Sequence, residues 1–177
     1  MTYKTSGHRY GVNGMVYVKT QSDYFTRPAY RVFLKTATLA REYRALNSAI
    51  ELGLSVPEIV FFRENDGVTE LVLKEILNGI PLNQYLSGSD SSAQKIEVVK
   101  NLALQIRRLH FRGWAHGALG NDHILVGPDG LVSLIDLEKM GWNASKCGTD
   151  LRRFWKRTQC LNHEQAACFR YWYGGSG

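Results

Sequence analysis

The stretch from about residue 93 to residue 135 constrains the fold of this chain most. Apolar residues recur every three or four positions over 93–112, which predicts an amphipathic helix that Gly113 ends. The apolar stripe consists of Ile96, Val99, Leu102, Ile106 and Leu109. A polar loop, HGALGNDH at residues 116–123, follows this helix, and a hairpin of two short strands follows the loop. The predicted order is therefore a long helix, a polar loop and a small hairpin.

The N-terminal half is predicted to contain strands and one helix. Asn13-Gly14 is typical of a type I′ turn that leads into a β-rich strand, and Gly53 marks the end of a helical pattern. A polar and aromatic connection over residues 20–35 separates this strand from the helix. The predicted elements are a strand at 15–19, a helix at 36–52, and strands at 59–62 and 70–76 joined by Asn65-Asp66-Gly67.

Helices dominate the second half. The predicted elements are a short helix at 82–86, the helix at 93–112, strands at 123–126 and 131–135 around Pro128-Asp129-Gly130, and helix from about 149. The polar stretch at 87–92 is a linker that can cap the next helix. This order predicts the α+β class and one two-lobed domain. Its expected parts are a small β-rich N-lobe (about 1–78), a helical C-lobe (about 79–173) and a flexible tail (174–177).

Composition narrows the class of partner. The net charge of +6 suits an anionic ligand, although the basic residues are spread along the chain and equally fit a solvated surface. The three cysteines form no CxxC pair, which favours reduced thiols. No apolar run approaches the roughly 20 residues that span a bilayer, and the first residues do not resemble a signal peptide. A cytoplasmic protein is expected, with at most peripheral contact with the inner membrane.

Three charged residues fit phosphoryl transfer from ATP. Lys19 lies on a predicted strand and could contact nucleotide phosphates, and Glu42 on the following helix could hold that lysine. Asp136 ends the predicted hairpin, where it could bind the metal that bridges the phosphates.

At this point the sequence resembles the protein-kinase-like superfamily. The loop at 116–123 resembles the HxDxxxxN motif in the HGD form of small-molecule kinases, and residues 135–138 resemble the DFG or IDFE segment. The closest resemblance is to the bacterial lipopolysaccharide kinase family, of the Kdo-kinase and InaA-like type, over roughly residues 15–158. It rests on VK at 18–19, REY at 41–43, GLSVPE at 53–58, HG at 116–117, HI at 123–124 and LIDLEK at 134–139.

The resemblance implies a reduced kinase-like fold and a set of roles. Lys19 would bind the α- and β-phosphates of ATP, with Glu42 as its ion-pair partner. Asp136 would be the main ligand of Mg²⁺ or Mn²⁺, and His123 would stand where protein kinases carry a second metal-binding asparagine. Asp150 would hold the backbone of the catalytic loop. The acceptor would be a sugar or lipid-linked sugar, such as a hydroxyl of the lipopolysaccharide core.

The sequence departs from the motif at its centre, because Ala118 stands where a kinase has its catalytic aspartate. A methyl group cannot accept the proton of the acceptor hydroxyl, a contribution of about 10²–10⁴ in rate. Asp122 or Glu138 could substitute. His116 belongs to the catalytic loop and, as in kinases, is expected to pin it. Nitrogen ligands such as His123 suit Mg²⁺ poorly, which makes Mn²⁺ an alternative.

Several other interpretations remain open. The scattered Gly7, Gly11 and Gly14 do not form a full phosphate lid, so a pseudokinase that binds a nucleotide or a partner is the main alternative to an active phosphotransferase. The interpretation as a nucleic-acid-binding protein rests on charge alone, and no nucleic-acid partner is expected. A transition-metal hydrolase site could use the residues His116, Asp122, His123 and Asp136, but their spacing does not match zinc ligand pairs. A basic helix face, Arg152, Arg153, Lys156 and Arg157, is either solvated or in contact with an acidic lipid or sugar phosphate.

Overall fold

A computed structural model of the chain describes residues 3–11, 14–22 and 38–174. Its first layer is an antiparallel sheet with the strand order β1-β2-β4-β3. The strands are β1 (Tyr3–Gly11), β2 (Gly14–Ser22), β3 (Ile59–Asn65) and β4 (Val68–Lys74). β2 runs three residues beyond its predicted end at Lys19, because Thr20, Gln21 and Ser22 pair with β4. The predicted connection over 20–35 is therefore wrong at its start, and residues 23–37 lie outside the described part.

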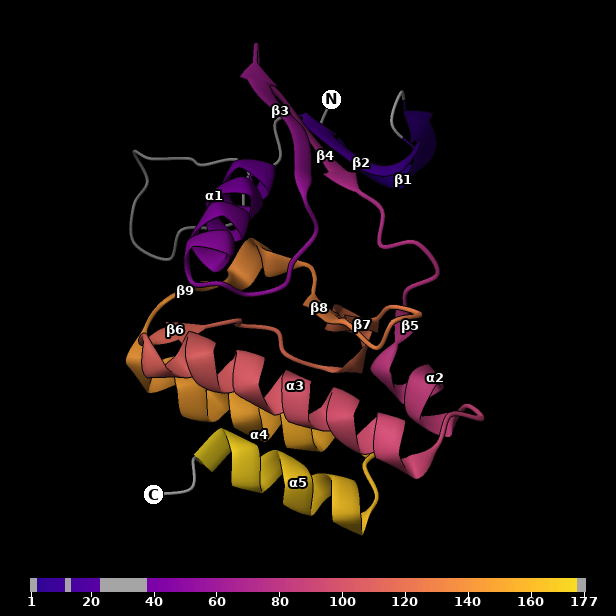
Figure 1. Cartoon of the computed structure of the whole chain (residues 1–177). Helices are drawn as coiled ribbons and strands as arrows, with labels where there is room; N and C mark the ends of the chain where they lie inside the picture. Colours follow the sequence, from indigo (N-terminus) through magenta and orange to yellow (C-terminus); the bar gives the residue numbers. More distant parts are fainter. Residues whose placement is uncertain (1–2, 12–13, 23–37, 175–177) are drawn as a thin grey trace.

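Helix α1 (Thr38–Glu51) packs against this sheet (Figure 1). Leu39, Leu46 and Ala49 lie on its buried face, whereas Ile50, which the helical pattern assigns to the same apolar face, is 50% exposed. The Gln21 side chain accepts a hydrogen bond from the Leu39 backbone N–H at 2.9 Å, so β2 satisfies a backbone donor at the start of α1.

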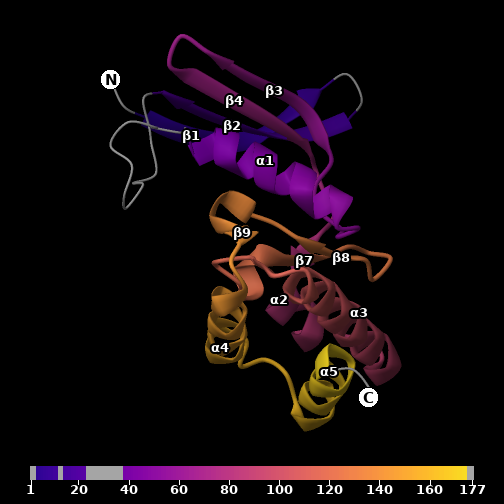
Figure 2. The same ribbon diagram turned by 90° about the vertical axis from the view of Figure 1, so that its left-hand side faces the viewer.

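Short elements occupy the middle of the molecule (Figure 2). One small sheet has the order β5-β7-β8, and a second pairs β6 with β9. Their bounds are β5 (Ile80–Pro81), β6 (Trp114–Ala115), β7 (Ile124–Val126), β8 (Val132–Leu134) and β9 (Gly141–Trp142). Three 3₁₀ turns accompany them: η1 (Asn121–His123), η2 (Leu137–Lys139) and η3 (Ala144–Lys146). The predicted hairpin after the polar loop is thus present as β7–β8.

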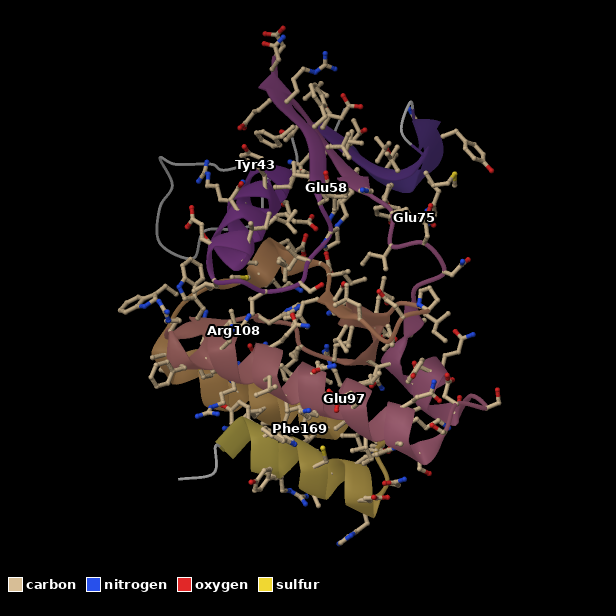
Figure 3. All side chains as sticks on the ribbon, in the orientation of Figure 1. Tyr43, Glu58, Glu75, Glu97, Arg108 and Phe169 are labelled. Carbon is tan, nitrogen blue, oxygen red and sulfur yellow. The ribbon has the colours of Figure 1, made fainter. Side chains whose placement is uncertain are left out.

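Helices form the opposite end of the molecule (Figure 1). They are α2 (Leu82–Ser87), α3 (Ser92–Phe111), α4 (Cys147–Arg157) and α5 (His163–Gly174). Ser91 caps α3 through a reciprocal capping box with Gln94, as the polar linker predicts. Figure 3 labels Phe169 on α5, and its ring stacks on Phe154 of α4 with 4.7 Å between centroids. Gly174, the first residue of the expected tail, is the last residue of α5.

One hydrophobic core joins the two ends. It is continuous from Leu39 of α1, through Leu134 of β8 and Ile106 of α3, to Phe169 of α5. A polar contact also joins α3 to the segment after α1: Arg108 of α3, labelled in Figure 3, donates a hydrogen bond to the carbonyl of Gly53. The structure is therefore a mixed α and β fold in which the small middle strands lie between the large sheet and the helices.

Candidate active site

A cavity of about 510 Å³ lies between the large sheet and the β7–β8 hairpin, within the range typical of small-molecule sites. The alternate residues of β1 and β2 that face it are Lys4, Ser6, His8, Tyr17 and Lys19. Leu125, Ile135 and Asp136 belong to the lining from the other part of the molecule. Glu75, labelled in Figure 3 on the segment that leaves β4, belongs to the lining as well.

Lys19 is held inside this cavity by Glu42. Its Nζ lies 2.6 Å from Glu42 Oε1, and the two residues are 8% and 1% exposed. Burial raises the pKa of Glu42, and the charge of Lys19 opposes that rise. Within the described residues Glu42 Oε2 has no hydrogen-bond partner, so this carboxylate depends on Lys19. Strand β2 and helix α1 thus bring together Lys19 and Glu42, as the sequence predicts.

Asp136 completes a charged row with these two residues. Its Oδ1 lies 3.7 Å from Lys19 Nζ, and its Oδ2 lies 3.4 Å from His123 Nε2. Asp136 has a left-handed backbone, with φ 59° and ψ 56°, between β8 and η2. A non-glycine residue there is uncommon and marks a constrained position, here one that turns the carboxylate into the cavity.

The tautomer of His123 follows from its other ring nitrogen. Nδ1 lies 2.7 Å from the carbonyl oxygen of Ala118, and because a carbonyl only accepts, Nδ1 carries the proton. In the neutral imidazole the lone pair is then on Nε2, the atom that faces Asp136. This is the orientation of a histidine able to share a cation with a carboxylate.

A buried aspartate holds the backbone of the loop that precedes His123. Asp150 of α4 accepts hydrogen bonds from the backbone N–H groups of His116 at 2.5 Å and Gly117 at 3.0 Å. His116 is fully buried, and its Nε2 donates to the carbonyl of Ile135, 3.1 Å away. Burial lowers the pKa of His116 to about 4, so the ring is neutral at pH 7. His116 connects the loop to the residue before Asp136, and its place among the catalytic residues of a kinase stays a prediction.

The proton acceptor that a kinase would use is missing from its position. Ala118 is 6% exposed, and its carbonyl is engaged by His123. Asp122 is exposed on η1, and its catalytic role also stays a prediction. Glu138, the other candidate, forms an ion pair with Lys4, with 3.0 Å between Oε2 and Nζ.

The donor set fits a divalent cation that arrives with phosphates. Among the described residues no group of three or more His, Cys, Asp and Glu side chains is arranged to hold a metal alone. Mg²⁺ is commonly held by one or two carboxylates together with substrate phosphates and water. Asp136 and His123 could supply such a partial site, whereas a preformed hydrolase site would need the larger cluster.

The comparison with protein families settles the relationship. The model of the lipopolysaccharide kinase (Kdo/WaaP) family matches residues 3–171 of the 177. The chain belongs to this family. Membership in the Kdo/WaaP family confirms the resemblance seen in the sequence motifs and indicates a function of the lipopolysaccharide-kinase type. No curated protein matches the chain significantly. In the described part of this Kdo/WaaP family chain, none of the helices is long and apolar enough to cross a bilayer.

Two features of the site were not anticipated. Lys4 lines the cavity next to Lys19, and His8 Nδ1 lies 3.2 Å from Glu75 Oε1. The polar sequence of β1 lacks the alternation that would have identified a strand, so neither contact had a local signal.

Proposed function

We propose that this protein binds ATP with Mg²⁺ or Mn²⁺ in the cavity and transfers the γ-phosphoryl group to a sugar hydroxyl, such as one of the lipopolysaccharide core. The observation that carries the proposal is the row Glu42–Lys19–Asp136, with contacts of 2.6 and 3.7 Å. A buried lysine held by a carboxylate, beside a second carboxylate in an open cavity, supports joint binding of phosphates and a metal.

The proposal includes a two-lobed arrangement with the nucleotide between the lobes. The N-lobe would comprise about residues 1–78 and the C-lobe about residues 79–173. Tyr17 and Leu73 on one side of the cavity and Leu125 on the other would enclose the base. The segment 75–79, three residues of which line the cavity, would connect the lobes.

Each side chain would contribute to positioning or charge. Lys19 would neutralise the α- and β-phosphates, and Glu42 would keep its ammonium in place. Asp136, with Nε2 of His123, would hold the divalent metal, which supplies charge neutralisation between the β- and γ-phosphates. The acceptor oxygen would form the new bond to phosphorus as the bond to the β-phosphate breaks and ADP leaves. With Ala118 in the loop, the hydroxyl proton would pass to a phosphoryl oxygen or to water.

Thermal unfolding with nucleotide tests the binding step. ATP with Mg²⁺ or Mn²⁺ should raise Tm, since a ligand at about 100 times its Kd stabilises the native state by about 2.7 kcal/mol. The increase should disappear in Lys19→Met and persist in the surface control Lys100→Met. An unchanged Tm with either metal would contradict nucleotide binding.

Release of ADP in the presence of lipopolysaccharide-core oligosaccharide tests the transfer step. Turnover that depends on the oligosaccharide supports the kinase proposal. Binding without turnover would instead favour the non-catalytic alternative, which rests on Ala118 in place of the catalytic aspartate.

A further inference from the structure

The surroundings of Asp136 contain more ionisable groups than the kinase motif accounts for. Three carboxylates, Glu42, Asp136 and Glu138, face two ammonium groups, Lys4 and Lys19. Although partial burial lowers the pKa of Lys4, Glu138 raises it through a hydrogen bond and its charge, and Glu42 and Asp136 add to that rise, so the net effect is a raised pKa. Lys4 is therefore charged and is drawn toward the same carboxylates as Lys19.

The register of β1 gives Lys4 its place beside Lys19. Ser6 is directly opposite Lys19, and Lys4 is opposite Gln21, so Lys4 is the diagonal neighbour of Lys19 on the cavity face. Lys4 is one of the residues that line the cavity. A ligand that contacts Lys19 and Asp136 is therefore within reach of a flexible four-carbon lysine side chain on the adjacent strand.

Lys4 can exchange its present partner, Glu138, for another anion. The pair between Nζ and Glu138 Oε2 measures 3.0 Å, and the side chains are 35% and 15% exposed. This pair is more open to solvent than the pair of Lys19 with Glu42, so water screens it more strongly. Lys19 differs, because its pair with Glu42 is buried and its ammonium stays in place. Lys19 is thus a fixed cation of the cavity, whereas Lys4 is an exchangeable one.

We propose that Lys4 is a second phosphate ligand, whose ammonium leaves Glu138 and binds the terminal phosphates of the nucleotide. The inference rests on the proposed function and identifies a binding residue that the kinase motif does not contain. A triphosphate carries more negative charge than one lysine and one divalent metal neutralise, and charge-assisted contacts to phosphate are the stronger kind of hydrogen bond. The exchange also releases Glu138 next to Asp136, and it links β1 to the bound phosphates.

Calorimetric titration of the full chain with ATP, AMP and inorganic tripolyphosphate tests the inference. Lys4→Met should weaken ATP and tripolyphosphate binding about tenfold, the size of one charge-assisted hydrogen bond, and leave AMP nearly unchanged. Lys100→Met is the matched control, because Lys100 also forms a 3.0 Å pair, with Glu97, away from the cavity. Lys4→Arg, which keeps the charge, should retain most of the affinity.

A second variant separates ligand binding from a structural bridge. Glu138→Gln removes the competitor of the phosphates, so tripolyphosphate should bind several-fold more tightly in EDTA, where metal contacts of Glu138 are excluded. If the Lys4–Glu138 pair only stabilised the fold, both variants would weaken binding in the same direction, and the inference would be overturned.

The outcomes distinguish this inference from the proposed function. Tripolyphosphate binding that falls in Lys4→Met, without any turnover of ATP, supports the role of Lys4 and counts against the kinase proposal. ATP binding and turnover that are the same in Lys4→Met as in the wild type overturn the role of Lys4 alone. A wild-type chain that binds neither ATP nor tripolyphosphate overturns both.

Discussion

His123 Nε2 lies 3.4 Å from Asp136 Oδ2, while the opposite ring nitrogen of His123 holds the Ala118 carbonyl at 2.7 Å. The imidazole therefore spans the distance from the loop backbone to the carboxylate. Nε2 is thus placed to contact Asp136 directly or a metal that Asp136 binds. The position that resembles a metal-binding asparagine thus presents nitrogen where an amide would present oxygen.

The first prediction concerns which metal supports nucleotide binding. Because imidazole suits Mn²⁺ better than Mg²⁺, the wild type should bind ATP more tightly with Mn²⁺. His123→Asn replaces the nitrogen with an amide oxygen and should reverse that preference, by about tenfold in the ratio of the two Kd values. Titration of ATP with each metal measures the ratio. The control His163→Asn, on the first turn of α5, should leave it as in the wild type.

A second prediction concerns the stability of the Lys19–Glu42 pair. Lys19→Met leaves the carboxylate of Glu42 buried without its partner, which should lower the free energy of unfolding at pH 7 by about 3–5 kcal/mol. The loss should shrink as the pH falls, because burial already raises the pKa of Glu42 and a protonated carboxyl tolerates burial. Urea denaturation at pH 7 and pH 5 measures both effects.

The double variant Lys19→Met/Glu42→Leu is the control for this pair. It removes the buried charge together with its partner, so most of the lost stability should return. If the double variant is less stable than Lys19→Met, then the buried carboxylate is not the origin of the loss.

The sequence predicted the parts of the site that depend on local patterns. Helix periodicity located α1 and therefore Glu42, and the hairpin after the polar loop located Asp136. The contact between Lys19 and Glu42 could be expected because a strand followed by a packed helix brings these positions together.

The contacts of β1 could not be predicted in the same way. Lys4 and Glu138 are 134 residues apart, and their contact depends on the register of β1 against β2. The nine residues of β1 are mostly polar or glycine, so they carry no alternation that fixes a strand or its buried face. The extension of β2 to Ser22 was missed for a related reason, since pairing with β4 and the contact of Gln21 with α1 override a polar sequence.

A third prediction concerns acid stability. His116 is buried and neutral, with a pKa of about 4 against an ordinary value of 6.5. Between these values the unfolded chain binds a proton that the folded chain does not, so stability is complete above pH 6.5 and falls as the pH drops toward 4. This residue should account for a loss of about 3 kcal/mol over that window. Urea midpoints from pH 7 to pH 4 measure the slope.

His116→Gln isolates the contribution of this residue. Glutamine keeps an N–H donor that can reach the Ile135 carbonyl, but it does not titrate between pH 4 and 7. The variant should therefore show a shallower decline than the wild type. Equal slopes would indicate that other groups cause the acid sensitivity.

The last prediction concerns the position where a kinase has its proton acceptor. Ala118 is buried, and its backbone is fixed, because His123 holds its carbonyl and Asp150 holds the two preceding N–H groups. A carboxylate introduced at 118 would therefore extend from a backbone whose position is already fixed. Ala118→Asp should raise the rate of ADP release with an acceptor by about 10²–10⁴, the usual contribution of a general base. Ala118→Asn, of nearly the same size but unable to accept the proton as a base, should give no such increase, and an equal gain in both variants would show that side-chain size rather than proton transfer limits the wild type.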